Sequence, residues 1–548
     1  MQSYLIKKTL SQCAATESGS IVFPAGVRRP VAFVYPNFYR IGMSNLGLHI
    51  LYKIINARGD CACERYFLPE QELLSEYKRS KTSLLSIETQ RALADNEVVF
   101  VMLSFEMDYE NLLTVLDLGN IKLRAKTRGE KEPLVIVGGP CATFNPLLLS
   151  GVADAFVIGE GEETVNKILD EVTENRQITL QKLSKIPGVY VPSVKNKVKR
   201  QWVKEIDKYP HTSAIITSQT EFANMYIVEV ARGCGRHCRF CMAGYCFRKP
   251  RHRALQNILQ DIENRPVGTE RIGLMGAAVS DHPQIKEIVA YLKEKKIKFS
   301  VASLRADTLD KEMCDALGNS GQKTLTVAPE AGSVKLRKAI NKGITEEHIF
   351  QALGLAARSG MHSIKLYFMI GLPGEDDSDI QAILQMVQQV RRMMDKIGYK
   401  GDLVLSVNAF VPKPFTPYQW DGMEDVKVLR HRFKMLTDGL RSETKIKLIT
   451  ESLKETVVQA ALARGDEKMG EYLLAAHESG QSLKTFMQSK GINLAEMAQR
   501  KLNVTDILPW EFIDMGVSKD YLLQEREKAK QGEFTAKCFD GCHRCGNC

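Results

Sequence analysis

The chain has 548 residues, of which 44% are hydrophobic and 26% are charged, an ordinary composition for a globular protein. This length exceeds what one hydrophobic core supports and predicts about three domains. No apolar run reaches the ~18–20 residues that span a bilayer, and the N-terminus lacks the order of a secretory signal, so we expect a cytoplasmic protein. The thirteen cysteines are then expected to be reduced thiols or metal ligands rather than disulfides.

The formal net charge of +10 could favour an anionic partner such as RNA, but the chain has no long basic run. Its densest basic stretch, KNKVKR at 195–200, is interpreted as the solvated tip of a polar hairpin. RNA therefore remains one possible partner that charge alone does not identify.

The first ~175 residues alternate between predicted strands and helices, which indicates a parallel sheet with both faces covered. A helix is expected from Ser44, its candidate N-cap, with Leu46, Ile50 and Ile54 on one face. Buried strands are expected at VAFVYP from Val31, EVVFVMLSFE ending near Phe105, PLVIVGG ending at Gly139 and ADAFVIGEGEE ending near Glu160. The last two end in glycine turns, where doubly wound sheets bind ligands.

A cysteine loop follows the strand YIVEVARGC, in VARGCGRHCRFCMAGYC. Cys234, Cys238 and Cys241 supply three close thiolates, which can hold three irons of a [4Fe–4S] cluster and leave the fourth iron open. A zinc site normally uses four ligands, and His237 would be a poorly placed fourth. Cys246 is interpreted as a buried thiol.

Strands and helices alternate again from 226 to about 420, which predicts a partial (β/α) barrel with its site at the strand ends. From about 425 the apolar spacing becomes helical. The chain closes with Cys538, Cys542, Cys545 and Cys548. Four thiolates could hold a second [4Fe–4S] cluster suited to electron relay; three would leave an iron open for substrate or sulfide; zinc is the structural alternative. His543 is expected to be exposed.

The pattern Cys-x3-Cys-x-aromatic-Cys, with Phe240 before the third cysteine, resembles the radical S-adenosylmethionine (SAM) superfamily. Further segments resemble its largely uncharacterised family with an N-terminal B12-binding-like domain and a C-terminal cysteine cluster. These segments are YRIGMSNLGLHILYKIIN, ERYFLPE, VGGPCATFNP, DAFVIGEGEE, CRFCMAGY, FVPKPFTPYQW and LPWEFIDMGVSKDYLL.

The resemblance implies an α/β fold in three parts. These are a flavodoxin-like (B12-binding-like) doubly wound sheet, a partial (β/α)6 radical SAM barrel, and a mainly helical C-terminal domain with a Cys-rich tail. The expected boundaries are 1–178 for the first domain, 179–222 for a linker with a polar hairpin, 223–424 for the barrel and 425–548 for the last domain.

The resemblance also implies the chemistry. SAM would chelate the open iron, and one electron would cleave it to methionine and a 5′-deoxyadenosyl radical, which abstracts hydrogen from an unactivated C–H bond. A low-potential electron donor such as ferredoxin or flavodoxin is the implied partner. By resemblance Glu330 takes the SAM ribose hydroxyls and Arg337 pairs with the SAM carboxylate. The other residues expected to line the SAM site are Phe240, Gly276, Ala277, Ala278, Ser303, Arg305, Asn408 and Phe410.

Whether cobalamin binds is a separate question, because the Asp-x-His-x-x-Gly motif is absent and His49 lacks that context. Some radical SAM relatives bind cobalamin without this histidine. The loops that would then surround the corrin contain Ser44, Asn45, Ser104, Phe105, Gly138, Gly139, Gly159 and Glu160.

Three hypotheses follow. The first is a cobalamin-dependent radical SAM enzyme that methylates an sp3 carbon. The second is a cobalamin-free radical SAM enzyme that uses the tail cluster for electron transfer or sulfur insertion. The third is a zinc-stabilised nucleic-acid-binding protein that makes no radical and binds RNA with a strong dependence on salt.

Overall fold

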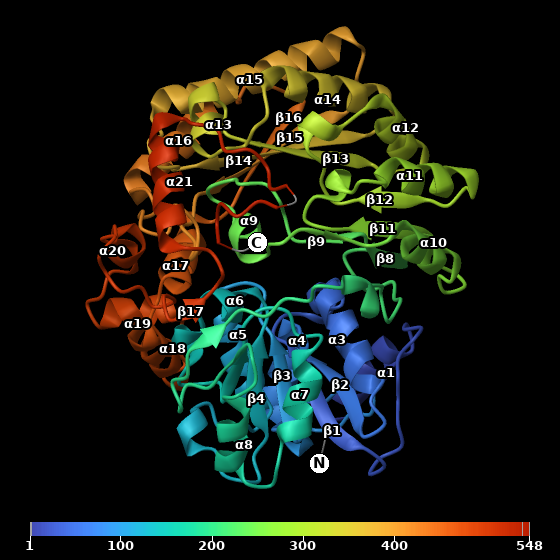
Figure 1. The fold of residues 1–548 in the computed structure, drawn as a ribbon, viewed down its shortest axis with the longest axis vertical. Coiled ribbons are helices and arrows are strands. Elements are labelled where there is room, and N and C mark those ends of the chain that lie inside the picture. Colours follow the sequence, from blue (N-terminus) through green and yellow to red (C-terminus); the bar gives the residue numbers. More distant parts are fainter. Residues whose placement is uncertain (1–2, 540, 547–548) are drawn as a thin grey trace. The chain divides into compact units, whose positions relative to one another are not determined.

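The computed structural model describes residues 3–539 and 541–546, which form two compact units (Figure 1). The first unit comprises Met1–Tyr226, Leu462–Leu494 and Ile507–Met515; the second comprises Ile227–Ala461, Ala495–Asp506 and Gly516–Cys548. The residues after 425 therefore divide between the two units, while the expected boundaries at 178, 222 and 424 stay predictions. No helix within the described ranges is long and apolar enough to cross a membrane.

The first unit is built on a six-stranded sheet in the order β2-β1-β3-β4-β5-β6. Its strands are β1 (Arg29–Tyr35), β2 (Cys61–Phe67), β3 (Val98–Met102), β4 (Leu134–Gly138), β5 (Ala155–Val157) and β6 (Val189–Tyr190). The first five pair in parallel, and β6 runs antiparallel to β5. The order 2-1-3-4-5 is that of the flavodoxin-like fold, as predicted.

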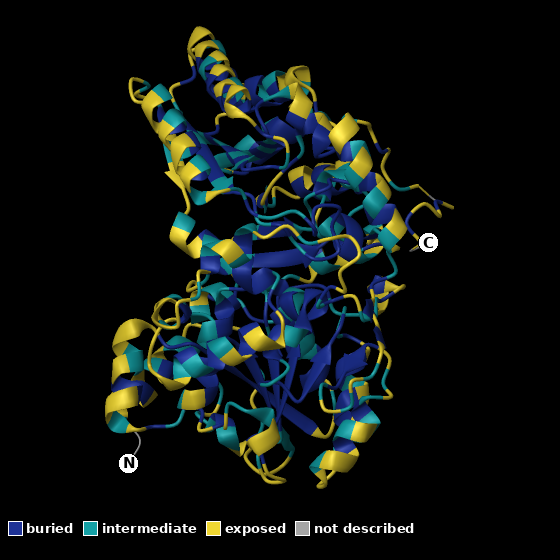
Figure 2. Cartoon of the chain, turned by 90° about the vertical axis from the view of Figure 1, so that its left-hand side faces the viewer, coloured by how far each residue is buried: buried dark blue, intermediate teal, exposed yellow. Residues whose placement is uncertain are grey.

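Helices cover both faces of this sheet, and the strands form its buried centre (Figure 2). The helices are α1 (Tyr4–Ala14), α2 (Tyr39–Gly42), α3 (Leu46–Asn56), α4 (Gln71–Ser80), α5 (Asp108–Leu118), α6 (Pro140–Phe144), α7 (Thr164–Glu171) and α8 (Arg176–Leu183). Two later helices, α18 (Glu467–Glu478) and α19 (Leu483–Ser489), belong to the same unit.

Two local predictions for the first unit are wrong. Asn45, not Ser44, caps α3, because the Asn45 side chain accepts the Leu48 amide, whereas the Ser44 hydroxyl donates back to Arg40 O. The basic stretch at 195–200 forms no hairpin. Its strand β7 (Val198–Lys199) pairs in parallel with β17 (Ile513–Asp514), some 300 residues later in the chain, a pairing that no local turn signal announces.

The second unit contains two sheets of a partial barrel, ordered β12-β11-β8 and β13-β14-β15-β16. Its strands are β8 (Met225–Glu229), β11 (Arg271–Met275), β12 (Phe299–Val301), β13 (Thr324–Glu330), β14 (Ser363–Ile370), β15 (Asp402–Ala409) and β16 (Ile446–Thr450). A parallel bridge between Leu304 and Val327 links the two sheets. The predicted six strands are present, and β16 extends the barrel by a seventh.

Each of the six strands is followed by at least one helix, as the (β/α)6 prediction requires. The helices are α10 (Leu255–Glu263), α11 (Ile285–Glu294), α12 (Lys311–Asn319), α13 (Val334–Ala339), α14 (Glu346–Arg358), α15 (Asp377–Lys396) and α16 (Val426–Gly439). The predicted helical C-terminal region is also present, as α17 (Leu453–Ala463), α18, α19, α20 (Leu494–Gln499) and α21 (Lys519–Gln531).

Candidate active site

The cysteine loop starts where β8 ends and is closed at its base by a short ladder. In this ladder β9 (Ala231–Arg232) pairs antiparallel with β10 (Arg251–His252). Gly233 has φ +80°, and a Cβ there would lie 2.1 Å from Phe247 O. Only glycine fits this turn, because an L side chain would meet both the strained φ and the opposing backbone. The loop then passes through the three cysteines into α9 (Ala243–Cys246).

The three predicted ligands lie near one another in this loop. Cys238 is buried, and Cys234 and Cys241 are half-buried. Burial raises the pKa of Cys241 to about 12, and the neighbouring Cys238 and Cys234 thiolates add to the shift. Burial also raises the pKa of Cys234. The raised pKa values of Cys234 and Cys241 fit a cationic metal cluster, because coordination to a cation deprotonates a thiol outright.

Other features of the loop fit a metal cluster, although the ligands are not preassembled. The Arg236 amide donates to Cys234 Sγ at 3.4 Å, a bond that favours the thiolate. Within residues 3–539 and 541–546, no set of three or more His, Cys, Asp or Glu side chains already surrounds a metal position. Cys246 is fully buried, in keeping with its interpretation as a core thiol.

Arg236 ties the loop to the ends of the next two strands. Its guanidinium donates to Asp281 Oδ1 at 2.7 Å, and it lies 3.5 Å from Asp307. Arg305 also binds Asp307, at 2.9 Å, and donates to Lys342 O at 3.0 Å. These ion pairs hold the loop over the carboxyl ends of β11 and β12.

Glu330 ends β13 with a backbone that an L residue rarely adopts. Its φ is +69°, and the pairing with β14 shifts register between Val327 and Glu330. Such conformations cost of order 1–3 kcal/mol and cluster at ligand sites. The bulge brings the Glu330 carboxylate to Lys342 Nζ at 3.0 Å, where both side chains are nearly buried.

Lys342 was not identified from the sequence. Its ammonium lies 6.0 Å from the centre of the Phe240 ring, and its charge lowers the pKa of Cys241 against the larger effect of burial. Phe240, Glu330 and Lys342 thus adjoin the thiols. The sequence AINKG carries no motif that would have singled out this lysine.

The remaining predicted SAM residues differ in their exposure and in their contacts. Gly276 passes so close to β9 that a Cβ would lie 2.9 Å from Ala231 O. Ala277 and Ser303 are exposed, and Ala278 is half-buried. Asn408 donates to Glu451 at 3.1 Å. Phe410 is buried in an apolar cluster against which Phe240 packs.

Arg337 has partners that differ from the expected SAM carboxylate. It is 3% exposed and donates to Ala331 O at 3.1 Å and Gly332 O at 2.5 Å, while it pairs with Glu346 at 3.3 Å. These contacts hold the loop between β13 and α13. The helix α13 is capped by the Ser333 hydroxyl, which accepts the Leu336 amide.

The C-terminal cysteines lie against the cysteine loop, within the same unit. The Cys538 amide donates to Gly235 O at 2.7 Å, and a Cβ on Gly235 would lie 3.5 Å from Cys538 Cβ. Cys542 and Cys545 are buried, His543 is exposed as expected, and Cys548 lies outside the described residues. Two arginines point at these thiols: Arg544 Nε lies 3.2 Å from Cys542 Sγ, and Arg248 Nη1 lies 3.4 Å from Cys545 Sγ. Cationic donors aimed at sulfur fit thiolate ligands of a metal.

The expected corrin residues of the first unit are partly engaged by their own chain. Gly159 bridges to Gln201 in parallel, and the Glu160 carboxylate accepts the Val203 amide at 2.8 Å. The Ser44 hydroxyl accepts the Glu221 amide at 3.0 Å. The carboxyl end of β5 is therefore partly covered by the linker residues Gln201 and Val203, and the role of Gly159 and Glu160 at a corrin stays a prediction.

The carboxyl ends of β3 and β4 differ from that of β5. Asn45 donates to Ser104 at 3.4 Å, and Phe105 is 43% exposed. Gly139 has φ +94°, and a Cβ there would lie 2.7 Å from Leu103 O; Gly138 has ordinary contacts only. Asn45, Ser104, Gly138 and Gly139 are half-buried, so the β3–β4 end of the sheet is partly exposed.

His49 cannot serve as a cobalt ligand in this conformation. Its Nε2 lies 2.9 Å from Met43 O, and its Nδ1 accepts the Ala214 amide at 3.1 Å. Burial lowers the pKa of His49 to about 4. The imidazole is a neutral structural bridge between α3 and the linker.

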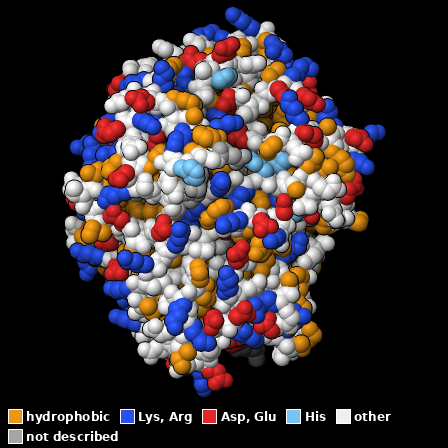
Figure 3. Space-filling view, in the orientation of Figure 1, with side chains coloured by type: hydrophobic (Ala, Val, Ile, Leu, Met, Phe, Trp, Pro, Cys, Tyr) orange, Lys and Arg blue, Asp and Glu red, His pale blue; other side chains and the backbone are white. Residues whose placement is uncertain are grey.

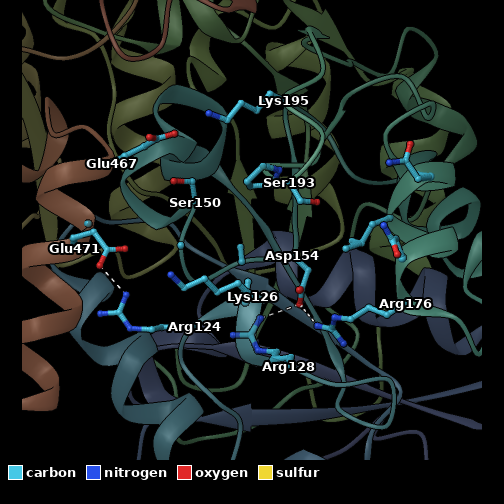
Figure 4. A pocket seen from close by; sticks show the side chains of 18 of the residues that line it. Arg124, Lys126, Arg128, Ser150, Asp154, Arg176, Ser193, Lys195, Glu467 and Glu471 are labelled. Carbon is cyan, nitrogen blue, oxygen red and sulfur yellow. Dashed lines mark hydrogen bonds and ion pairs between the residues drawn. The ribbon is translucent and has the colours of Figure 1, made fainter.

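A polar hollow of about 1000 Å³ lies elsewhere in the first unit (Figure 4). Asp154 receives Arg128 at 2.9 Å and Arg176 at 2.6 Å, and Arg124 pairs with Glu471 at 2.7 Å. Its buried charges therefore satisfy one another. On the face drawn in Figure 3, Lys and Arg side chains are interspersed with Asp and Glu over much of the surface.

Two family models match the chain. The N-terminal model of radical SAM proteins matches residues 47–192, and the radical SAM superfamily model matches residues 228–387, which include the three loop cysteines. The chain belongs to the radical SAM superfamily. A [4Fe–4S] cluster and SAM are the cofactors that this membership implies.

The individual proteins that are similar to this radical SAM chain share less than 30% sequence identity with it. It is 29% identical over 450 residues to an uncharacterised protein of Methanocaldococcus jannaschii, covering 81% of this chain and 90% of that protein. It is 24% identical over 271 residues to an uncharacterised methyltransferase of Pyrococcus horikoshii, covering 47% of this chain and 58% of that protein.

Among solved structures, the chain is similar to the radical SAM methyltransferase TsrM from Kitasatospora setae with tryptophan substrate and a SAM analogue bound. The TM-score is 0.49 at 15% identity, covering 69% of this chain and 72% of that chain. None of these similarities identifies the reaction.

Proposed function

We propose that this radical SAM enzyme cleaves SAM at a [4Fe–4S] cluster held by Cys234, Cys238 and Cys241, and abstracts hydrogen from an unactivated C–H bond of its substrate. We further propose that the C-terminal cysteines hold a second iron–sulfur cluster. The observation that carries this second part is the 2.7 Å hydrogen bond from the Cys538 amide to Gly235 O, which sets one thiol cluster directly against the other.

The chain's own residues would bind and orient SAM. When bound, the cluster supplies the single electron that cleaves the SAM sulfonium. Glu330, held in a strained backbone beside Phe240, would accept hydrogen bonds from the ribose hydroxyls. Lys342 and Arg305 are cations beside the thiols, and they would balance the SAM carboxylate in place of Arg337, whose guanidinium already binds Ala331 O, Gly332 O and Glu346.

The tail runs from an exposed residue to a buried thiol, which fits a role in electron transfer. Phe539 is 61% exposed, whereas Cys545 is fully buried beside Arg248. Four Cys thiolates are the usual ligand set of a [4Fe–4S] cluster that has no open iron and transfers electrons. A low-potential donor of the ferredoxin or flavodoxin class would then deliver electrons at the exposed side of the tail.

The tail cluster is tested with Cys545→Ala and a matched control, Cys246→Ala, which removes another fully buried thiol of the same unit. After anaerobic reconstitution, Cys545→Ala should lose about half of the iron, roughly four of eight atoms for two [4Fe–4S] clusters, and should still bind SAM. Cys246→Ala should keep all of the iron. Zinc in the tail, or unchanged iron in Cys545→Ala, would contradict the second cluster.

Cobalamin-dependent methylation is a second candidate. It is favoured by the partly exposed β3–β4 end of a flavodoxin-like sheet, where Phe105 is exposed, and by the methyltransferase name of the Pyrococcus horikoshii relative. The partly covered end of β5 weighs against it. Corrin absorption after reconstitution with cobalamin would support it, and no retained corrin would exclude it.

A further inference from the structure

A buried polar network connects the two cysteine clusters of the second unit. Its centre is Arg248, which is fully buried. Arg248 Nη1 lies 3.4 Å from Cys545 Sγ in the tail, and Nη2 lies 2.7 Å from His237 Nδ1 in the cysteine loop. Its Nε donates to Gly244 O. One guanidinium therefore contacts both a tail thiol and the histidine that precedes the loop ligand Cys238.

His237 continues the network on the side of the loop. It directly precedes Cys238 and is 1% exposed. Its Nδ1 receives the Tyr521 hydroxyl at 2.6 Å as well as Arg248, so the ring proton is assigned to Nε2. The carbonyl of His237 accepts Asn341 Nδ2 at 3.1 Å, and the same amide donates to Thr535 O at 2.9 Å. The loop and the tail are thus fixed to each other on both sides of this histidine.

Arginine presents a positive charge and fixed N–H donors, and in Arg248 one of these donors faces the sulfur of Cys545. Hydrogen bonds to the sulfurs of an iron–sulfur cluster are among the features that set its reduction potential. A buried cation that donates to a ligand sulfur favours the state with one more electron, because that state is more negative. The contact with Cys545 places this effect on the tail cluster.

We infer that Arg248 is a positioning residue that makes the tail cluster easier to reduce and fixes it against the SAM-cluster loop through His237. This inference rests on the proposed second cluster. The reaction concerned is the uptake of one electron by the tail cluster from a low-potential reductant, with no bond made or broken. Arg544, which donates to Cys542 from the exposed side, would act on the same cluster, and its other hydrogen bonds go to Ala536 O and Lys537 O of the tail.

The test is an anaerobic redox titration of the full chain with both clusters, followed by electron paramagnetic resonance. At a fixed solution potential, Arg248→Met should lower the ratio of reduced to oxidised tail cluster about tenfold, the effect of losing one hydrogen bond from a charged donor. Arg248→Lys, which keeps the charge, should recover part of this ratio. The SAM-cluster ratio should change less than about threefold in either variant.

Tyr521→Phe is the matched control, because it removes the other partner of His237 Nδ1 and leaves the contact between Arg248 and Cys545 in place. It should change the tail ratio less than about threefold. An unchanged tail ratio in Arg248→Met, or an equal shift in Tyr521→Phe, would overturn the inference and leave the second cluster standing. If Arg248→Met does not retain iron, the ratio of reduced to oxidised tail cluster in Arg248→Lys decides. A ratio below the wild-type value supports the inference, and an unchanged ratio overturns it. A wild-type tail without iron would overturn both.

Discussion

The two units present the same kind of sheet edge and use it differently. In each, parallel strands end in turns that contain glycine. In the second unit these ends carry three thiols and the Glu330–Lys342 pair, whose side chains adjoin one another. In the first unit, several polar groups at the strand ends bind their own chain, as Glu160 binds the Val203 amide and His49 the Ala214 amide.

This difference shows that the cysteine spacing predicts a functional site, whereas glycine at a strand end predicts only a turn. Glycine at the end of a strand is needed whenever the chain turns sharply, so it does not distinguish a ligand site from a covered edge. Three cysteines at fixed spacing have few uses besides metal binding in a chain expected to lack disulfides. The strained backbone at Glu330 adds independent support, because strain persists only where the surrounding structure holds it.

The largest effect should come from Cys238→Ala, which removes a cluster ligand from the second unit alone. Production of 5′-deoxyadenosine from SAM and dithionite should fall below detection, because two thiolates and an open position do not hold the cube. The product is quantified by liquid chromatography. Cys246→Ala should retain cleavage, and full turnover by Cys238→Ala would contradict the assignment of the site.

A smaller effect is expected from Glu330→Gln. Losing a carboxylate that accepts ribose hydroxyls should weaken SAM binding about 10–100-fold, since hydrogen bonds to charged groups contribute about 1.5–3 kcal/mol. Equilibrium binding of SAM to the reconstituted protein measures this. Glu346→Gln is the control: it removes the partner of Arg337 and should leave SAM affinity unchanged. If Glu346→Gln lost as much SAM affinity as Glu330→Gln, Arg337 would have to be counted among the residues that bind SAM.

The smallest effect on SAM cleavage should come from Asp108→Asn in the first unit, a substitution that changes the pH dependence of stability. Burial raises the pKa of Asp108 to about 6, above about 3.9 in the unfolded chain. Its contribution to stability is therefore full below pH 4 and is lost as the pH rises through 6. The variant should remove about 2 kcal/mol of this pH dependence and leave SAM cleavage unchanged.

Urea unfolding of the first unit at pH 4.5 and 7.5 measures that dependence. Asp117→Asn, at an exposed position of the same helix α5, is the control and should behave as the wild type. If Asp108→Asn kept the wild-type difference between the two pH values, the buried carboxyl would not be its source.

Much of the fold was predictable because the patterns that determine it are local. The buried strand at Val31 and the strand that ends near Gly139 follow from apolar runs. The short strand β16 was not predicted, because an edge strand with only Ile446 buried carries little pattern. The pairing of β7 with β17 joins residues too distant in sequence for any local signal.

The site was predictable to a lesser extent. The spacing of Cys234, Cys238 and Cys241 identified the loop, but the side chains around it come from several strands and the tail. Lys342 and Arg248 sit in segments without a motif, and only the folded chain brings them to the thiols. Arg337 illustrates the converse, since a suitable charge one turn into a helix was already bound by backbone carbonyls.

The most direct test of the central claim is anaerobic purification with iron, sulfide, zinc and corrin quantified, followed by addition of dithionite and SAM. The account predicts about eight irons per chain with matching sulfide, as two [4Fe–4S] clusters require, and formation of 5′-deoxyadenosine and methionine. Zinc in place of iron, without 5′-deoxyadenosine, would contradict it.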